Sequence, residues 1–377
     1  GLSDFMFAND PFQSNRGRNW FEIKWFLYNL KYLLEISEDS SFSFSFFGLD
    51  AKRNSLGFRT NRVDQIDYGD ERDLIKGNFK NFGFESRYLT NYSFLNRKSY
   101  LLLGVKYYNS YSQSTQGPGS NSKDADFNFD YASFPNYVNQ SEYSYPNNNL
   151  AIFGENIYYL NEKLSITPGF RFENINTSLD GYYRKINLDA AGNTIYNERF
   201  DEQDTKKRKF LLLGLGLSYK NQDLEIYTNF SQNFRSVTFA DISIINPAYA
   251  INPSIDDEKG FTFDLGFRGN YKKIVSFDSS IFALIYRDRI GFIQKVFSDG
   301  NVKSERGNVG NAQITGVESL FDFDVNEILF KNDNLDFNIF FNYSYIESKY
   351  LKSNEVGITG KEVEFVPKNN FKTGLKF

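Results

Sequence analysis

Short turns and long polar connections alternate along almost the whole chain, with strand-like segments between them. The short turns lie at 37–41, 95–98, 161–163, 220–223, 270–273 and 331–334. The long connections lie roughly at 53–80, 113–147, 183–206, 235–258, 294–312 and 350–368. One rim with short turns and one with longer loops is typical of an outer-membrane β-barrel. A soluble sandwich has turns of mixed length at both ends.

Apolar and polar residues alternate within the strand-like segments. The clearest cases are 41–46, 211–218, 261–268 and 335–345, each with one apolar and one polar face. We expect strands of roughly 10–16 residues, whereas soluble strands are usually nearer 5–6. A tilted membrane strand needs about 9–11 residues in hydrocarbon. The lengths therefore favour strands that cross a membrane.

Composition agrees with a barrel wall that faces lipid on one side and water on the other. Hydrophobic residues make up 40% of the chain, aromatic residues 18% and charged residues 24%, and the mean hydropathy is −0.51. No stretch approaches the ~18–20 consecutive apolar residues of a spanning helix. We predict an all-β fold, a transmembrane antiparallel β-barrel with long extracellular loops and short periplasmic turns. A Tyr-rich soluble β protein is the alternative.

Several classes of function are disfavoured by what the chain lacks. Without Cys or His, it can build no disulfide, no Cys/His metal site and no Ser-His or Cys-His catalytic unit. We expect neither an enzyme nor a cofactor, although a barrel enzyme with an Asp-based site stays open. Acidic and basic residues are interleaved, with a net charge of −4 and no basic stripe for nucleic acid.

The strand count suggests part of a larger barrel. We count about 13 strands, the first at about 19–35, whereas single-chain bacterial barrels normally have even numbers. The start, Gly1–Phe5, has no features of a signal peptide. We therefore expect residues 1–377 to be part of a single outer-membrane barrel domain that lacks strands at its N-terminal side and at its C-terminal side. Phe377 is aromatic, as natural barrel ends often are.

Motifs in the second half carry a family resemblance. Residues 228–242 lead into Asn252–Glu258, a turn of N-P-x-L-x-x-E type with Ile255 at the Leu position, and then into the strand 258–268. Residues 286–290 and 308–318 continue a "Y…I…N-x-G…G-V-E" run. This arrangement resembles TonB-dependent outer-membrane receptors. Two further pairs of segments, 12–20 with 56–62 and 164–173 with 180–184, are similar to Bacteroidetes-type iron(III) dicitrate receptors.

The resemblance implies a fold and a set of partners. Family barrels have about 22 strands and a plugged lumen, so this chain would be a barrel segment without the plug, the TonB box or a signal peptide. The implied activity is binding and energised uptake of a ferric chelate, ferric citrate-like in chemistry. The implied partners are the chelate, outer-membrane lipid and a TonB-type coupling protein that acts through the missing plug.

Arginine suits an anionic chelate because its planar fork matches carboxylates. Six arginines lie near the expected outer ends of strands, and we take them as candidate ligand residues: Arg16, Arg18, Arg53, Arg59, Arg62 and Arg235. Each could instead pair with loop carboxylates such as Asp64, Asp67 and Asp241. Two other functions stay open: a receptor for another siderophore or an oligosaccharide, since the loops are rich in Tyr, and an open porin or adhesin.

Overall fold

The computed structural model describes residues 2–60, 63–237, 249–252, 254–297, 302–331, 336–353 and 355–377. These residues form a fourteen-stranded sheet in which all strands except β9 follow one another in chain order as an antiparallel meander. The elements are α1 (Asp4–Asn9), β1 (Trp20–Ser37), β2 (Ser40–Gly57), β3 (Arg72–Phe94), β4 (Arg97–Gly119), β5 (Gln140–Tyr159), β6 (Leu164–Leu188), β7 (Thr194–Asn221), β8 (Leu224–Arg235), β9 (Tyr249–Ile251), β10 (Glu258–Tyr271), β11 (Val275–Val296), β12 (Val302–Asp324), η1 (Asn326–Phe330), β13 (Asn338–Lys352) and β14 (Asn369–Lys376).

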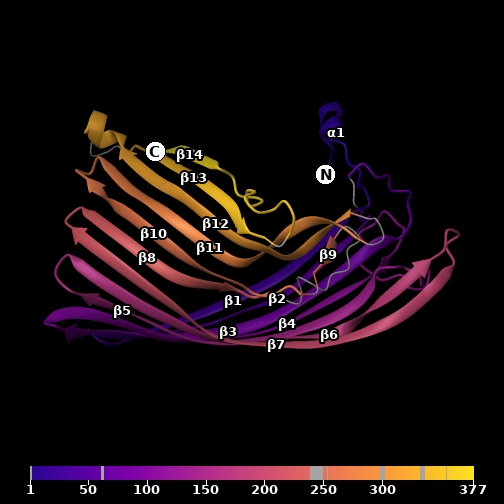
Figure 1. Ribbon diagram of the computed structural model, residues 1–377, viewed down its shortest axis with the longest axis horizontal. Helices are drawn as coiled ribbons and strands as arrows, with labels where there is room; N and C mark the ends of the chain where they lie inside the picture. Colours follow the sequence, from indigo (N-terminus) through magenta and orange to yellow (C-terminus); the bar gives the residue numbers. More distant parts are fainter. Residues whose placement is uncertain are drawn as a thin grey trace.

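The sheet is a curved, open wall (Figure 1). Among the described residues, β1 pairs only with β2 and β14 only with β13, and β9 adds a short parallel pairing to β12. No described helix is long and apolar enough to cross a membrane. The predicted all-β antiparallel architecture is confirmed, with the wall not closed on itself.

The two rims differ as predicted, with two corrections. Five short turns join strand pairs at 38–39, 95–96, 160–163, 222–223 and 272–274, but the sixth connection, 325–337, is longer and contains η1. Long connections occur at 58–71, 120–139, 236–257 and 353–368. The long loops predicted at 183–206 and 294–312 are wrong, because strands extend to short connections at 189–193 and 297–301.

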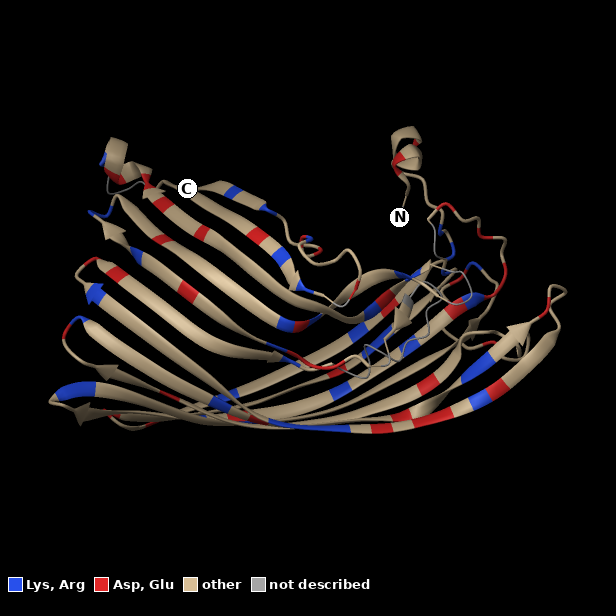
Figure 2. Ribbon diagram, in the orientation of Figure 1, with Lys and Arg blue, Asp and Glu red and all other residues tan. Residues whose placement is uncertain are grey.

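Strand length is a further correction. β7 has 28 residues and β6 has 25, well beyond the 10–16 expected. Their far ends carry polar residues on both faces, so the sequence there lacks the alternation that marks a half-buried strand. The tip is stabilised by Asp189, whose Oδ1 accepts hydrogen bonds from the Ala191 N–H at 2.9 Å and the Asn193 N–H at 2.8 Å. Figure 2 shows this hairpin with alternating acidic and basic segments toward its tip.

One face of the sheet is apolar and open. The ladder places Leu217, Leu265, Ile281, Val317 and Tyr345 on this face, at equivalent heights of their strands. Leu265 is 40% exposed and Ile281 is 51% exposed, although both lie in central strands. So large an exposed apolar surface is stable in contact with lipid rather than water. We call it the outer face, and the opposite face, which the loops cover, the inner face.

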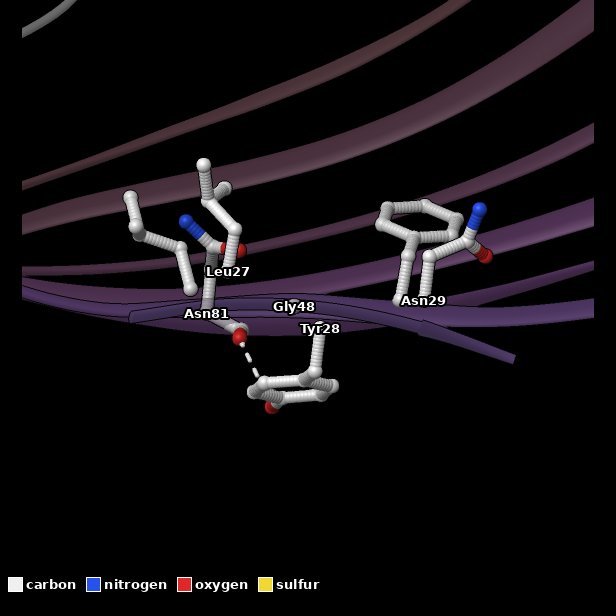
Figure 3. Close-up of a pocket in the computed structure, with 7 residues that line it drawn as sticks. Leu27, Tyr28, Asn29, Gly48 and Asn81 are labelled. Atoms are coloured by element: carbon white, nitrogen blue, oxygen red, sulfur yellow. Dashed lines mark hydrogen bonds between the residues drawn. The ribbon is translucent and has the colours of Figure 1, made fainter. Parts of the chain in front are cut away.

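A glycine near the middle of β2 accommodates an aromatic ring. Figure 3 shows Tyr28 on one side of the β1–β2 pair and Leu27 and Asn29 on the other. The Tyr28 ring lies against Gly48, and its hydroxyl donates to the Asn81 carbonyl at 3.3 Å. A Cβ at residue 48 would come within 2.2 Å of the Tyr28 hydroxyl and 2.5 Å of the Asn81 carbonyl. The ring therefore requires glycine here.

Gly48→Ala should weaken the pairing of β1 with the wall. Overpacking of this kind costs roughly 1–3 kcal/mol, because the ring or the backbone must move. Gly214→Ala is the matched control, since its nearest neighbour atom would be 3.8 Å from the new Cβ. Urea unfolding of the detergent-solubilised protein should show a lower midpoint for Gly48→Ala only. Equal midpoints for the two variants would contradict this packing.

Candidate functional site

The rim with long loops holds a buried polar network. Arg18, between α1 and β1, donates to Asp67 of the β2–β3 connection through Nε at 2.9 Å and through a second, shorter contact. It also donates to the carbonyls of Asp70 at 3.1 Å and Asn121 at 2.9 Å. One guanidinium thus ties the N-terminal segment to two loops.

Arg72, at the start of β3, is fully buried with 0% exposure. Its guanidinium donates to the carbonyls of Ser120 and Asp124, both at 2.8 Å, and to the Arg18 carbonyl at 3.1 Å. It also donates to the Ser122 hydroxyl at 3.0 Å. Because every one of these contacts is internal, Arg72 holds the β4–β5 connection in place rather than facing a ligand.

Asp73 lies next to this network and is almost fully buried. It accepts hydrogen bonds from Arg59 at 3.0 Å, Gln116 at 3.0 Å and the Tyr137 hydroxyl at 2.8 Å. Burial raises the pKa of Asp73, and the neighbouring Arg59 charge opposes that shift. Arg59 is therefore engaged in compensating a buried carboxylate.

The Arg18–Asp67 contact predicts loss of loop order in acid. The Arg18 guanidinium holds the pKa of Asp67 below its ordinary 3.8. A depressed carboxylate pKa stabilises the fold above the unfolded pKa and loses that effect as the pH falls through the folded pKa. Amide exchange in residues 63–71, corrected for intrinsic rate, should be constant from pH 7 to 5 and rise below pH 3.8. Asp67→Asn should exchange faster already at pH 7; a pH profile identical to wild type would contradict the assignment.

A second group of charges lies on the inner face around the ends of β8 and β10. A cavity of about 340 Å³ is lined by Asn233, Arg235, Glu258, Tyr286 and Arg289, among others. The Arg235 side chain is 53% exposed, and its only ion-pair partner among the described residues is Glu258, at 3.8 Å. The Asn233 Oδ1 has no hydrogen-bond partner in the described ranges. The cavity thus offers an accessible cation next to a buried acceptor that has no partner in the described ranges.

The wall next to this cavity contains a seam. β7 and β8 stop pairing at Gly214 and Ser231, although β7 continues for many residues. Beyond that point side chains bridge the gap: the Leu213 N–H donates to the Gln232 Oε1 at 3.0 Å. Arg208 donates to Asp257, just before β10, at 2.5 and 2.8 Å and to the Val237 carbonyl, just after β8, at 3.2 Å. We call residues 208–213 and 232–237, with Asp257, the seam.

The β13–β14 connection folds back onto the inner face. Arg289 donates to Glu364 at 2.7 Å and to the Tyr350 hydroxyl at 3.0 Å, and Tyr350 donates to Glu364 at 2.7 Å. Val363 packs into a small apolar cluster with Tyr350 and Ala312. Because Arg289 is used in this way, Arg235 is the more accessible of the two cavity arginines.

The structure brings together only part of the predicted arginine set. Arg16, Arg18 and Arg59 gather at the N-terminal network, where Arg16 donates to the Thr60 hydroxyl at 2.9 Å. Arg53 is exposed on the inner face of β2, over the Phe79 ring at 5.5 Å. Arg235 lines the separate cavity, and Arg62 lies outside the described residues, as does Asp241. Ligand binding by the six stays a prediction.

Sequence reasoning missed Arg72, Arg208 and Arg289. Arg72 lies in the expected loop 53–80, and Arg208 lies two residues after the expected loop 183–206, within a run of four cations. Their roles depend on contacts between residues far apart in sequence: Arg208 donates to a residue 49 positions away and Arg289 to one 75 positions away. No group of three or more acidic, His or Cys residues suited to a metal occurs in the part of the chain that the structure describes.

Comparison with known families identifies the family of this chain. The family model "TonB dependent receptor-like, beta-barrel" matches residues 3–377. The chain belongs to this family. The receptor resemblance drawn from residues 228–318 is thereby confirmed at the family level, and the family is one of outer-membrane receptors. No curated protein sequence matches the chain.

Solved structures of receptors and transporters share the fold of this family member. The ferric citrate transporter FecA in its unliganded form is similar with a TM-score of 0.71 and 17% identity, over 100% of this chain and 50% of that one. The ferric yersiniabactin uptake receptor FyuA from Yersinia pestis gives 0.70 and 16%, over 95% and 47%. The copper transporter OprC gives 0.68 and 16%, over 96% and 51%. The chain thus spans about half the length of these proteins.

Proposed function

We propose that this chain is part of the wall of an outer-membrane receptor for TonB-energised uptake of an anionic ferric chelate, ferric citrate-like in chemistry. The observation that carries the proposal is Arg235, a half-exposed guanidinium beside a 340 Å³ polar cavity on the inner face. A guanidinium there can bind a carboxylate through two parallel hydrogen bonds. Family membership supports the receptor role.

The candidate arginines differ in burial and in what they contact. Arg18 is almost fully buried and donates to Asp67 and two carbonyls, so it organises loops. Arg53 and Arg235 are exposed on the inner face, where a ligand would pass. The resemblance to Bacteroidetes-type iron(III) dicitrate receptors and the FecA-like fold support ferric citrate as the ligand to test first.

One observation favours a second candidate ligand. Tyr143 stacks on Tyr145 at 6.0 Å and Tyr183 stacks on Phe200 at 5.3 Å near the same rim. Aromatic faces suit a sugar or an aromatic siderophore. Tyr143 and Tyr145 are buried, however, so these rings support each other more than they offer a platform. The anionic chelate is therefore the better-supported ligand.

Uptake of radiolabelled ferric citrate by cells that carry the full-length gene tests the proposal. We expect uptake that requires a proton gradient and is competed by excess ferric citrate. Arg235→Gln should reduce affinity about tenfold or more, since a hydrogen bond to a charged group contributes about 1.5–3 kcal/mol. Arg199→Gln is the matched control, because Arg199 is equally exposed and pairs with Asp201 on the distant hairpin.

The outcomes separate the alternatives. Uptake that ignores the gradient would indicate an open pore. Absence of uptake with normal surface expression would exclude ferric citrate and move the search to other siderophores or oligosaccharides. Equal losses for Arg235→Gln and Arg199→Gln would exclude a specific role of the cavity.

A further inference from the structure

Two cations face each other on the outer face of the β10–β11 hairpin. Lys259 and Arg287 are direct partners in the ladder, and both are exposed. Neither forms an ion pair with any residue that the structure describes. Like charges directly opposite each other destabilise a sheet. An external anion at this position would offset the repulsion.

Two of the nearby carboxylates are used elsewhere. Asp257 pairs with Arg208. Glu258 lies on the inner face and accepts a hydrogen bond from the Ile290 N–H at 2.8 Å. Asp288 lies in a bulge, with a left-handed φ of 55° and a shift of register around it. The Lys259–Arg287 pair is therefore left as a local positive site on the outer face.

An apolar groove lies further along the same hairpin and on the same face. Its volume is about 420 Å³, and Leu265, Phe267, Ile281 and Val317 line it. From Lys259 to Leu265 is six residues, or about 20 Å at ~3.3 Å per residue. A strand tilted by about 40° turns this into about 15 Å of depth. That is half of a hydrocarbon core about 30 Å thick, the depth of one leaflet.

The surface between the two features is apolar. Phe261 and Phe263 follow Lys259 at every second position of β10, so all three side chains lie on the outer face. The two Phe residues are paired with Ile285 and Ala283 of β11. A soluble anion or a polar protein segment would not match this strip. A lipid would match it, because a lipid has a charged headgroup at the membrane surface and an acyl chain that extends through one leaflet. The cation pair and the apolar groove lie in that order and at that separation.

We propose that the β10–β11 hairpin binds one phosphate-bearing anionic lipid of the surrounding membrane. The phosphate lies between Lys259 and Arg287, and one acyl chain runs over Phe263 into the groove at Leu265 and Ile281. Lys and Arg both bind phosphate, Lys as a point charge and Arg as a fork. The inference rests on the proposed membrane location but not on the identity of the transported ligand.

Native mass spectrometry of the full-length protein in detergent micelles tests the site. The probes are dipalmitoylphosphatidylglycerol, dipalmitoylphosphatidylcholine and inorganic phosphate. Wild type should prefer the anionic lipid. The double variant Lys259→Gln with Arg287→Gln should lose roughly 10- to 30-fold in its affinity, as expected for two cations at a membrane surface. Binding of phosphatidylcholine should not change.

A matched control removes the same charges elsewhere. Arg184→Gln with Lys185→Gln takes one Arg and one Lys from the projecting β6–β7 hairpin, and its lipid binding should equal wild type. Ile281→Trp fills the groove, so it should weaken dipalmitoyl but not dihexanoyl phosphatidylglycerol. Unfolding midpoints of all variants establish that each is folded.

Three results would overturn the proposal. One is unchanged phosphatidylglycerol affinity in the Lys259/Arg287 double variant. The second is binding of inorganic phosphate as tight as that of the lipid, which would leave only an ion site. The third is equal sensitivity of short- and long-chain lipids to Ile281→Trp. None of them depends on ferric citrate uptake, so failure of the proposed transport function would be seen separately.

Discussion

Asp257→Ala should destabilise the wall by about 3–5 kcal/mol, the usual cost of leaving one member of a buried ion pair without its partner. Arg208 is almost fully buried and gives Asp257 two hydrogen bonds, and the Val237 N–H donates a third at 3.0 Å. Without the carboxylate, the guanidinium would be uncompensated at the seam. Hydrogen exchange should therefore accelerate in residues 199–213, and the urea midpoint should fall.

Asp201→Ala is the control for this prediction. It breaks an ion pair of the same type, Arg199–Asp201, in which both side chains are mostly exposed. Exposed pairs contribute little because water and salt screen them, so no shift of the midpoint is expected. Similar behaviour of Asp257→Ala and Asp201→Ala would contradict a stabilising buried ion pair at the seam.

Arg72→Gln should release the β4–β5 connection while leaving the sheet intact. The variant loses charge-assisted hydrogen bonds to the carbonyls of Ser120, Asp124 and Arg18. Each such bond contributes about 1.5–3 kcal/mol, so trypsin cleavage after Lys123 should rise roughly 100-fold through local opening.

Arg87→Gln is the comparison, since Arg87 lies on the same strand but contacts Glu85 and the Phe153 ring instead of the connection. Its cleavage rate after Lys123 should stay at the wild-type value. Equal rates in wild type and Arg72→Gln would mean that the connection is held by other contacts.

The strands that the sequence predicts well are those with one apolar face. Segments 41–46, 211–218 and 261–268 fall within β2, β7 and β10, and the side chains alternate between the two faces as expected. The stretches 183–206 and 294–312 were predicted as loops because both faces there are polar. Alternation of apolar and polar residues indicates a strand that is buried on one face. A strand that is exposed to water on both faces shows no such alternation.

The site was less predictable than the fold. Chemistry alone selects arginine for an anionic ligand, but it does not separate Arg18 from Arg235. Arg18 is occupied by Asp67, 49 residues away, and by Asn121, 103 residues away. Arg235 is held only weakly by Glu258. That difference depends on contacts between loops that are distant in sequence, which a pattern of residues does not encode.

The long β6–β7 hairpin makes the rim uneven in height. From Asn174, where the apolar outer positions end, to Leu188 is about 50 Å of strand, and Figure 1 shows the hairpin extending past its neighbours. Whether a molecule that approaches this rim contacts the projecting hairpin depends on the size of that molecule. A large molecule that approaches this rim would therefore meet the tip of the β6–β7 hairpin before it reached the shorter neighbouring strands.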